Sequence, residues 1–585
     1  MQADHILPSD GIPYPLDIPL KAWVGRMTHG ISPAALGAAL EDWWIHLAAS
    51  PGKQAELAES AMRKLLQWLL LTHGSLPGTP SESLVPPSQD KRFHPQQWGS
   101  PPFNQIAHAF LLTQQWWTEA TTHVRGVSRH HQEVTEFMTR QWLDMWSPSN
   151  FVATNPQLQQ EVLATGGQNL AVGFANWWQD AIAVLTESNP PGAERFKPGE
   201  TVATTPGKVV FRNRLIELIQ YEPTTPGVHP EPVLIVPSWI MKYYILDLSP
   251  NDSMVKYLVD KGHTVFMISW KNPDATDRDL RMDDYIELGV LAAIKAVEAI
   301  GAKQGIHAVG YCLGGTLLAI VAAALARDER SPLKTLTLLA GQIDFQEPGE
   351  LGLFIDDSQI AFLEDLTFGP GYLDGRQMAG AFALINSKDL VWSKLVHEYL
   401  MGAQTPLNDL HAWNADATRM PHRMHSEYLR RLYLYNDLAE GRYPVGHRPV
   451  AIQDIRLPIF VVSTERDHVS PWRSVYKIHL LTDTEISFVL TAGGHNVGIV
   501  NPPNGPQAHP AASHRFAMRA TGSPYVDPQT WLDTAPILPG SWWTTWQRWL
   551  AEHSSKRAAP LPIGGRGGTR LRALANAPGA YVHGV

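Results

Sequence analysis

The chain has 585 residues and a mass of 64.9 kDa, which is large for one compact domain, so we expect two domains. Hydrophobic residues make up 44% of the chain and charged residues 18%, a composition that excludes a protein disordered throughout. The formal net charge of -9 and the lack of a long basic run argue against a nucleic-acid binder, because phosphate recognition relies on clustered Lys and Arg.

The only cysteine, Cys312, cannot form a disulfide within the chain, so nothing indicates an oxidising compartment and we expect a cytoplasmic protein. The N-terminus has neither the basic start nor the apolar core of a signal peptide. No stretch reaches the ~18 uninterrupted apolar residues of a transmembrane candidate. We therefore predict no membrane span.

The first part of the chain is predicted to be mostly helical. Apolar and aromatic residues recur at helical spacing over residues 36–71, 103–145 and 157–185. Residues 74–102, rich in Pro, Ser and Gly, are predicted to form a linker or long surface loop. A second Pro- and Gly-rich break precedes a change of pattern, so we place the domain boundary near residues 188–205 and assign residues 1–200 to the N-terminal domain.

Tryptophan is abundant, with 21 residues, and several occur in pairs: Trp43-Trp44, Trp116-Trp117, Trp177-Trp178 and Trp542-Trp543. Amphipathic aromatic side chains suit a boundary between water and an apolar phase. They equally suit helix faces that pack on a core, and we expect this second arrangement for most of them.

After the boundary, short β-rich runs alternate with helical segments, which is typical of a mostly parallel sheet covered by helices on both faces. The predicted strands are residues 208–211, 215–219, 233–236, 264–268, 306–309, 333–339, 459–462 and 486–490. This is an α/β-hydrolase pattern, and we assign residues 201–555 to an α/β catalytic domain. From about 345 to 448 the alternation stops, which predicts a mostly helical lid insertion. Residues 556–585 are predicted to form a flexible tail.

Cys312 lies in the sequence Gly-Tyr-Cys-Leu-Gly-Gly, between a short apolar strand and an apolar helix. A nucleophile elbow has this order, and its sharp turn requires flanking glycines, here Gly310 and Gly314, where a Cβ atom would clash. A thiol is partly ionised near neutral pH and is strongly nucleophilic as the thiolate, which suits exchange with thioesters. The alternative is a small buried hydrophobic residue without a chemical role. The glycines and the strand-to-helix order favour the nucleophile.

A cysteine nucleophile needs a base and a third group that orients the base, and in this fold the chain order is nucleophile, acid, histidine. Asp467 follows the seventh predicted strand, and His495 lies in a Gly-rich loop after the eighth. Asp344, one strand earlier, is the alternative acid, and His468 is the histidine most easily mistaken for the base. We favour Asp467 and His495.

Acyl transfer also needs donors for the developing oxyanion, normally the amide after the nucleophile and one from an early strand-to-helix loop. The Leu313 amide is the first candidate. The second is expected from residues 237–240, and we assign it to Trp239, although the sequence leaves open which amide points inward.

These residues together resemble the polyhydroxyalkanoate synthases, which carry a lipase-like box with cysteine in place of serine and a downstream Asp-His pair. Further stretches similar to that family are Val-Pro-Ser-Trp-Ile-Met-Lys-Tyr-Tyr-Ile-Leu-Asp-Leu from 236, Ser-Trp-Lys-Asn-Pro from 269, Trp-Asn-Ala-Asp-Ala-Thr-Arg from 413, Gly-His-Asn-Val-Gly-Ile-Val-Asn-Pro-Pro from 494 and Gly-Ser-Trp-Trp from 540. The resemblance covers roughly residues 100–550 and is to the class I type. The chain departs from the family pattern at Ser238 and over residues 424–430, which bear on the acyl chain length accepted.

The resemblance implies an α/β-hydrolase superfamily enzyme that polymerises short-chain (R)-3-hydroxyacyl-CoA, such as 3-hydroxybutyryl-CoA, with release of CoA and without a cofactor or metal. Cys312 would carry the acyl group, His495 would act as base, and Asp467 would orient His495 and help to activate the 3-hydroxyl of the next unit. Trp413 and Asn414, on the lid, would be either neighbours of the substrate channel or structural residues.

The resemblance also implies that the Trp-rich N-terminal part mediates homodimerisation and attachment to polyhydroxyalkanoate granules, with phasins as further partners. Two other functions stay open. A cysteine-dependent acyl-CoA thioesterase or esterase would use the same triad with water as acceptor, and a granule-surface binding protein would leave the triad idle.

Overall fold

The computed structural model describes residues 16–28, 30–72, 92–186, 188–330, 332–385, 387–506, 508–566 and 571–584. The chain divides into two compact units. The first, the sheet unit, comprises Met1–Gly30, Gly192–Ala379 and Leu407–Val585, and the second, the helical unit, comprises Ile31–Pro191 and Gly380–Pro406. The sequence predicted a single domain boundary near residues 188–205, whereas each unit of the structure is assembled from separate segments of the chain. Packing, rather than chain order, decides the unit to which a segment belongs.

One large sheet forms the core of the sheet unit, in the order β14-β13-β12-β11-β6-β5-β3-β4-β2-β1-β15. All eight predicted strands are present. The strands are β1 (Gly207–Arg212), β2 (Ile216–Tyr221), β3 (His229–Val236), β4 (His263–Trp270), β5 (Ile306–Tyr311), β6 (Leu333–Leu339), β11 (Ile459–Thr464), β12 (Ile486–Thr491), β13 (Ser513–Arg519), β14 (Ile537–Pro539) and β15 (Ala575–Asn576). The pairs from β4 through β12 are parallel, and the strands outside them pair antiparallel.

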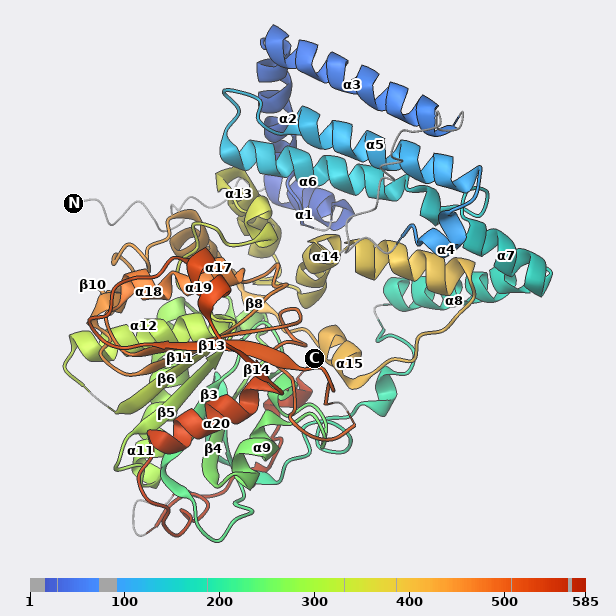
Figure 1. Ribbon diagram of the computed structural model, residues 1–585. Helices are drawn as coiled ribbons and strands as arrows, with labels where there is room; N and C mark the ends of the chain where they lie inside the picture. The colour runs from blue at the N-terminus through green and yellow to red at the C-terminus, as the bar shows by residue number, and fades with distance from the viewer. Residues whose placement is uncertain are drawn as a thin grey trace. The chain divides into compact units, whose positions relative to one another are not determined.

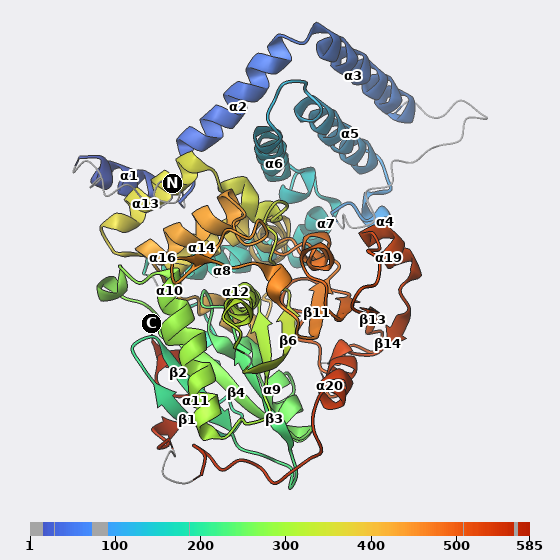
Figure 2. The same ribbon diagram turned by 90° about the vertical axis from the view of Figure 1, so that its left-hand side faces the viewer.

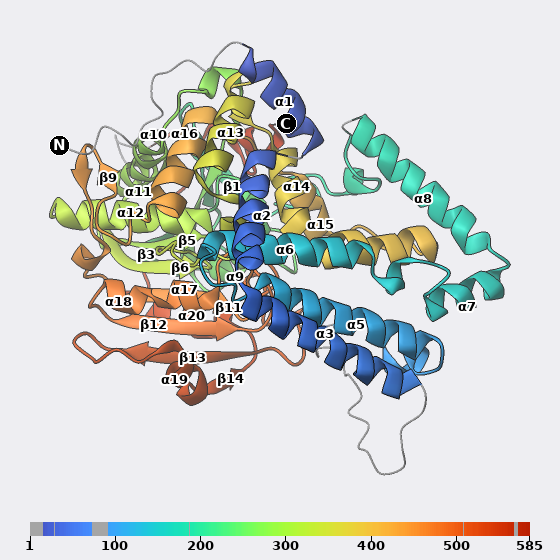
Figure 3. The same ribbon diagram turned by 90° about the horizontal axis from the view of Figure 1, so that it is seen from above.

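The central strands are buried on both faces, as their apolar sequences predict. Every residue of β4, β5, β11 and β12 is buried. Helices α11 (Ala292–Ile300) and α12 (Leu313–Arg327) cover one face of the sheet, and α9 (Met254–Asp260) and α20 (Trp542–Glu552) cover the other (Figures 1, 2 and 3). This is the predicted α/β-hydrolase arrangement, in which the carboxyl ends of the parallel strands gather at one edge of the sheet.

Short helices complete the sheet unit. They are α1 (Asp17–Met27), α9 (Met254–Asp260), α10 (Met282–Asp284), α11 (Ala292–Ile300), α12 (Leu313–Arg327), α13 (Asp357–Phe368), α15 (Asp409–Ala415), α16 (His422–Tyr428), α17 (Trp472–Tyr476), α18 (Ile478–Leu481), α19 (Pro528–Thr534) and α20 (Trp542–Glu552), with the π-helical turns η5 (Tyr285–Leu291) and η9 (Leu429–Leu434). The 3-10 turns are η2 (Ala193–Arg195), η3 (Tyr243–Leu246), η4 (Ala275–Asp277), η6 (Glu350–Phe354), η10 (Ile452–Asp454) and η12 (Tyr581–His583). Two small ladders pair β7 (Tyr372–Leu373) with β8 (Met420–Pro421) and β9 (Pro444–Val445) with β10 (Arg448–Pro449).

The predicted lid insertion, residues 345–448, is mostly helical in the structure. Helix α14 (Gly375–Ile385) spans the division between the units, and residues 380–406 belong to the helical unit. Helix α1 packs against α13 and so belongs to the sheet unit. The sequence pattern shows where helices form, but it does not show which distant segment each one packs against.

The C-terminal segment differs from the predicted flexible tail. Strand β15 pairs antiparallel with β1, at the edge of the sheet. The buried Glu217 carboxylate accepts hydrogen bonds from the Ala580 and Tyr581 amides at 2.8 and 2.9 Å, and the Tyr581 hydroxyl donates to the Asn213 carbonyl at 2.6 Å. A buried carboxylate needs such partners, so residues 571–584 are part of the fold.

The helical unit is built from helices at the predicted positions and from one short helix, α4 (Pro95–Trp98), that lies within the predicted loop 74–102. They are α2 (Pro33–Ala48), α3 (Pro51–Thr72), α4 (Pro95–Trp98), α5 (Phe103–Thr121), α6 (Arg129–Met145), α7 (Pro156–Thr165) and α8 (Gln168–Leu185), with the turns η1 (Pro148–Asn150), η7 (Lys388–Trp392) and η8 (Leu395–Leu400). Of the predicted loop 74–102, residues 74–91 lie outside the described residues. No helix in the described ranges is long and apolar enough to cross a membrane.

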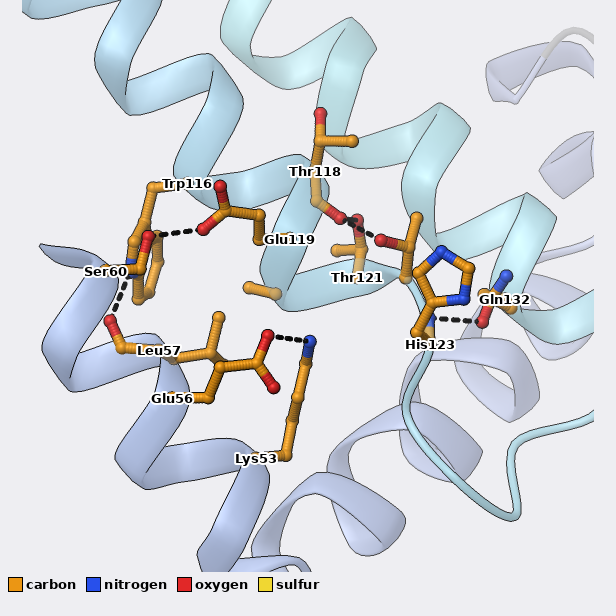
Figure 4. A network of polar contacts seen from close by, with 12 residues as sticks. Lys53, Glu56, Leu57, Ser60, Trp116, Thr118, Glu119, Thr121, His123 and Gln132 are labelled. Atoms are coloured by element: carbon orange, nitrogen blue, oxygen red, sulfur yellow. Dashed lines mark hydrogen bonds and ion pairs between the residues drawn. The ribbon is translucent and has the colours of Figure 1, made fainter. Parts of the chain in front are cut away.

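Helices α3, α5 and α6 run side by side, and polar contacts join α3 to α5 (Figures 1 and 4). The Trp116 indole donates to the Leu57 carbonyl at 3.0 Å, and the Ser60 hydroxyl donates to the Glu119 carboxylate. Trp116 and Trp117 contact each other edge to face, with ring centroids 5.2 Å apart. These tryptophans pack between helices, the arrangement that we expected for most of the pairs.

Three buried histidines lie at the beginning of neighbouring strands of the sheet unit: His229 in β3, His263 in β4 and His307 in β5. The rings of His229 and His263 stack, with centroids 4.8 Å apart. Burial lowers the pKa of His263 to about 3 and that of His307 to about 4, and the charged or titratable groups that face them are His229, Glu231, Lys334, His553 and Arg557.

Acid is expected to destabilise the fold through these histidines. The unfolded chain binds protons below the ordinary pKa of 6.5, whereas folded His263 stays neutral down to about 3, so the free energy of unfolding falls as the pH drops. Neither ring nitrogen of His263 has a hydrogen-bond partner among the residues described. His263→Phe should therefore remove about 2 kcal/mol of the wild-type stability loss between about pH 7 and pH 5, measured by urea unfolding. An unchanged loss in the variant would contradict this expectation.

Candidate active site

Cys312 occupies a sharp turn between β5 and α12. Its backbone has φ 54° and ψ -125°, in the left-handed region that non-glycine residues rarely adopt. A Cβ atom on Gly310 would lie 2.4 Å from the Gly315 Cα atom, and one on Gly314 would lie 2.2 Å from the Val236 carbonyl oxygen. The glycines therefore let the helix start press against β5 and the end of β3. This geometry is that of a nucleophile elbow.

The turn places the thiol at the carboxyl edge of the parallel strands. The Cys312 amide donates to the Leu339 carbonyl of β6 at 2.9 Å, and the residue is 8% exposed. Cys312 also occupies the N-cap position of α12, where the helix dipole favours a negative charge. This position at the helix N-terminus suits a thiolate.

Asp467 and His495, the predicted acid and base, meet on the loops after β11 and β12. His495 Nδ1 lies 2.8 Å from Asp467 Oδ2. Asp467 Oδ1 accepts hydrogen bonds from the Val469 and Ser470 amides at 2.9 and 2.7 Å, and its side chain is fully buried. The loop amides therefore fix the carboxylate, and the carboxylate fixes the imidazole with Nε2 left free for proton exchange.

The thiol completes this arrangement. The charge of Cys312 acts on the imidazole of His495, which Asp467 holds by a hydrogen bond. Burial by itself lowers the pKa of His495, but the charges of Asp467 and Cys312 and the hydrogen bond with Asp467 raise it well above its usual value. The imidazole is therefore a strong base beside the thiol, and an imidazolium is stabilised there once it forms.

The two alternative residues have other surroundings. The Asp344 carboxylate accepts a hydrogen bond from the Gln346 amide at 2.9 Å and pairs with Lys477 Nζ at 3.5 Å. His468 is exposed, and its carbonyl accepts a hydrogen bond from the Glu350 amide at 3.2 Å. The structure thus brings Asp467, rather than Asp344, to His495.

The predicted oxyanion donors are the Leu313 amide, directly after the nucleophile, and the Trp239 amide, on the loop after β3. The Leu313 amide is the first of α12, and the first amides of a helix have no acceptor within it. The loop after β3 packs against the start of α12, because the Val236 and Pro237 carbonyls fill the space beside Gly314. Trp239 on that loop is buried, and its carbonyl accepts a hydrogen bond from the Thr418 hydroxyl at 2.6 Å. The assignment of these two amides to the oxyanion stays a prediction.

The two predicted channel residues differ from each other. Trp413 is buried in α15, and its indole donates to the Lys242 carbonyl at 2.7 Å, so it supports the loop after β3. Asn414 is exposed. These contacts favour the structural alternative for Trp413.

Sequence reasoning missed an aromatic group near the thiol. Burial, and to a smaller extent the charge of Cys312, raise the pKa of Tyr428 and Tyr433, whose rings lie 5.4 Å apart. The Trp239 ring contacts Tyr428 edge to face at 6.0 Å. Tyr311, before the nucleophile, lies 5.8 Å from the His495 ring and donates to Asn496 Oδ1 at 2.7 Å. The departure at residues 424–430 was the one sequence signal that pointed to Tyr428.

Comparison with known proteins shows which family this chain is similar to. The family "Poly-beta-hydroxybutyrate polymerase (PhaC) N-terminus" matches residues 89–258, "Poly-beta-hydroxybutyrate polymerase N terminal" matches 11–53, and "alpha/beta hydrolase fold" matches 231–502. The "Poly(3-hydroxyalkanoate) polymerase" of Methylorubrum extorquens is 39% identical over 538 residues, 91% of this chain and 87% of the relative.

Two further relatives are similar over most of their length. The "Poly(3-hydroxyalkanoate) polymerase subunit PhaC" of Rhizobium etli is 37% identical over 84% of this chain and 76% of its own. The protein of the same name from Cupriavidus necator is 37% identical over 85% of this chain and 83% of its own. With this similarity and the elbow geometry together, the chain belongs to the poly(3-hydroxyalkanoate) polymerase family, on an α/β-hydrolase fold.

Proposed function

We propose that this chain is an acyltransferase that polymerises (R)-3-hydroxyacyl-CoA, such as 3-hydroxybutyryl-CoA, into a polyester through an acyl group bound to Cys312. The observation that carries the proposal is the position of Cys312 in a nucleophile elbow, where its charge acts on a His495 that Asp467 orients. The names of the relatives supply the polymer. A thiol nucleophile suits a thioester substrate, because one thioester replaces another at little cost in free energy.

The first step loads the enzyme. The Cys312 sulfur attacks the thioester carbonyl carbon as its proton passes to His495, and the Leu313 amide stabilises the oxyanion. The bond between the acyl carbon and the CoA sulfur then breaks, and CoA leaves as the thiol with the proton from His495.

The second step lengthens the chain. A 3-hydroxyl oxygen of another hydroxyacyl unit attacks the carbonyl carbon of the Cys312 thioester, and His495 takes the hydroxyl proton. An ester forms, the carbon–sulfur bond to Cys312 breaks, and the proton returns to the sulfur. Asp467 orients His495 in both steps and stabilises its charged form.

The test measures CoA release from (R)-3-hydroxybutyryl-CoA by the full chain and sizes the acyl product in the same sample. High-mass polyester with CoA release supports the polymerase. Release that yields free 3-hydroxybutyrate alone would make the protein a thioesterase. No release from this or longer hydroxyacyl-CoA substrates would leave granule binding as the function.

The helical unit carries a surface that suits attachment to the polyester product. Helix α8 buries its polar side: the Asn169 and Asn176 amides donate to the Leu400 and Glu398 carbonyls of η8 at 2.7 and 3.0 Å. A Cβ atom on Gly173, between them, would lie 2.0 Å from the Tyr399 carbonyl oxygen. The helix thus packs on η8 through polar groups and a glycine.

The other side of α8 is apolar and exposed, the reverse of a helix on a soluble core. Its large exposed apolar side chains, which we call the α8 face, are Val172, Phe174, Trp177, Trp178, Ile182, Val184 and Leu185. The rings of Phe174 and Trp178 stack at 6.4 Å. Exposed apolar patches of this kind mark interaction sites, and we infer that the α8 face contacts the granule surface.

The double variant Trp177→Ser, Trp178→Ser should bind emulsified poly(3-hydroxybutyrate) particles several-fold more weakly than wild type in a sedimentation assay, because it removes apolar area from the contact. CoA release from soluble substrate should stay near the wild-type rate. Leu480→Ser and Met518→Ser, which change exposed apolar side chains of the sheet unit, are the controls. Unchanged particle binding would contradict the inference, and a loss of dimer mass with unchanged binding would assign the face to a second copy.

A further inference from the structure

The Gly-Ser-Trp-Trp sequence at the start of α20 has no role in the chemistry above, yet its side chains converge on the loop that carries His495. The Trp542 indole donates to the Gly498 carbonyl at 3.0 Å, and the Trp543 indole donates to the Ile499 carbonyl at 2.9 Å. The Ser541 hydroxyl donates to the carbonyl of Asn501. Three successive side chains thus each hold one carbonyl of a single loop.

These donors are buried. Trp542 is 0% exposed, Trp543 1% and Ser541 3%. A buried indole N–H needs an acceptor, and a buried carbonyl needs a donor, so each contact is costly to lose. The three contacts therefore hold the backbone of this loop in place at three of its carbonyl groups.

The held carbonyls lie next to His495 in a tight turn. The Gly498 amide donates to the Gly494 carbonyl at 2.9 Å, which closes a turn with His495 inside it. A Cβ atom on Gly498 would lie 2.5 Å from Thr464 Cγ2 at the end of β11, so the turn is pressed onto the strand that precedes Asp467. A shift at Gly498 would move His495 relative to both Asp467 and Cys312.

Helix α20 itself is anchored to the sheet. The Trp546 indole, one turn further along the helix, donates to the Thr337 hydroxyl of β6 at 3.1 Å, and Trp546 is 0% exposed. Strand β6 pairs with β5, the strand that ends at the elbow. The Trp546 bond therefore ties α20 to the sheet, whereas the bonds from Ser541, Trp542 and Trp543 hold the histidine loop.

We propose that Ser541, Trp542 and Trp543 form a clamp that positions His495 against Cys312. They are positioning residues, since they act through the loop and touch no reacting atom. A misplacement of about 1 Å costs on the order of 10²-fold in rate at such a site. The proposal rests on the Cys312–His495 pair of the proposed function, but it does not depend on which acyl acceptor is used.

The chain offers a matched control for the test. Trp542→Phe and Trp546→Phe each remove an indole N–H from a fully buried tryptophan of the same helix. The lost bond goes to the histidine loop in Trp542→Phe and to β6 in Trp546→Phe. Both variants should lower the midpoint of urea unfolding, so any difference between them in reactivity reports on the loop.

Reactivity is read from the pH dependence of iodoacetamide alkylation, which reports only on Cys312 because the chain has no other cysteine. In Trp542→Phe the alkylation profile should move to higher pH, with a rate near neutral pH at least tenfold below wild type. Trp546→Phe should keep the wild-type profile. Equal profiles in the two variants, or an equal shift in both, would overturn the clamp.

Ser541→Ala keeps the test open if Trp542→Phe does not fold, because it deletes one hydroxyl and should move the profile in the same direction. No movement in a folded Ser541→Ala and Trp543→Phe pair would also overturn the proposal. The alkylation readout needs no polymer, so failure of the clamp and failure of the proposed polymerase are told apart by the separate product analysis.

Discussion

Cys312→Ala should abolish CoA release, with a loss of at least about 10³-fold, because no other thiol in the chain can carry the acyl group. Alanine and cysteine are equally restricted at a φ of 54°, so the substitution should leave the backbone strain of the turn unchanged. The Cys312→Ala protein should therefore still fold. The measurement is CoA release under saturating substrate, alongside the urea midpoint of each protein. A folded Cys312→Ala that retains a tenth of the wild-type rate would contradict the assignment of the nucleophile.

Cys312→Ser tests the thiol itself. Serine fits the elbow, and the serine hydroxyl is common as the nucleophile of this fold, but its proton is far harder to remove than that of a thiol. The expected rate lies well below wild type and above Cys312→Ala. A serine variant as fast as wild type would mean that His495 supplies full base catalysis and that the thiol gives no advantage with a thioester substrate.

Asp467→Asn should lower CoA release by about 10³- to 10⁴-fold, because an amide at this position no longer holds His495 in the tautomer with Nε2 free. The pH dependence supplies a second readout. Burial lowers the pKa of His495 and the Asp467 carboxylate raises it, so its removal lets the imidazolium lose its proton at lower pH. His495 acts as a base only after it has lost this proton, so the acidic limb of the pH–rate profile should move to lower pH.

Asp344→Asn is the matched control, since it makes the same change at the other candidate acid. The Asp344 carboxylate pairs with Lys477 and accepts a bond from Asn436, away from the histidine. We expect activity within several-fold of wild type and a pH–rate profile that does not move. A large loss in Asp344→Asn together with a small one in Asp467→Asn would exchange the two assignments.

The sequence predicted the α/β-hydrolase core because local sequence patterns are enough to indicate this fold. Strand and helix runs alternate, and the elbow needs its glycines within a few residues of Cys312. The order of nucleophile, acid and histidine along the chain pointed to Asp467 and His495. In the structure, Asp467 Oδ2 lies 2.8 Å from His495 Nδ1. Each of these signals depends on neighbours in sequence or on the known order of strands in the sheet.

The remaining features depend on contacts between distant segments, and only the tertiary structure decided them. Packing placed residues 380–406 in the helical unit and docked the C-terminal segment on Glu217. The Gly-Ser-Trp-Trp motif could be recognised in the sequence. The Gly498 carbonyl, which accepts the hydrogen bond from the Trp542 indole, is 44 residues away along the chain. Hydrogen bonds of this kind leave no periodic trace in the sequence, because either partner alone is compatible with many surroundings. The sequence by itself therefore determined the fold and the chemistry, and tertiary packing decided how the reacting groups are held in place.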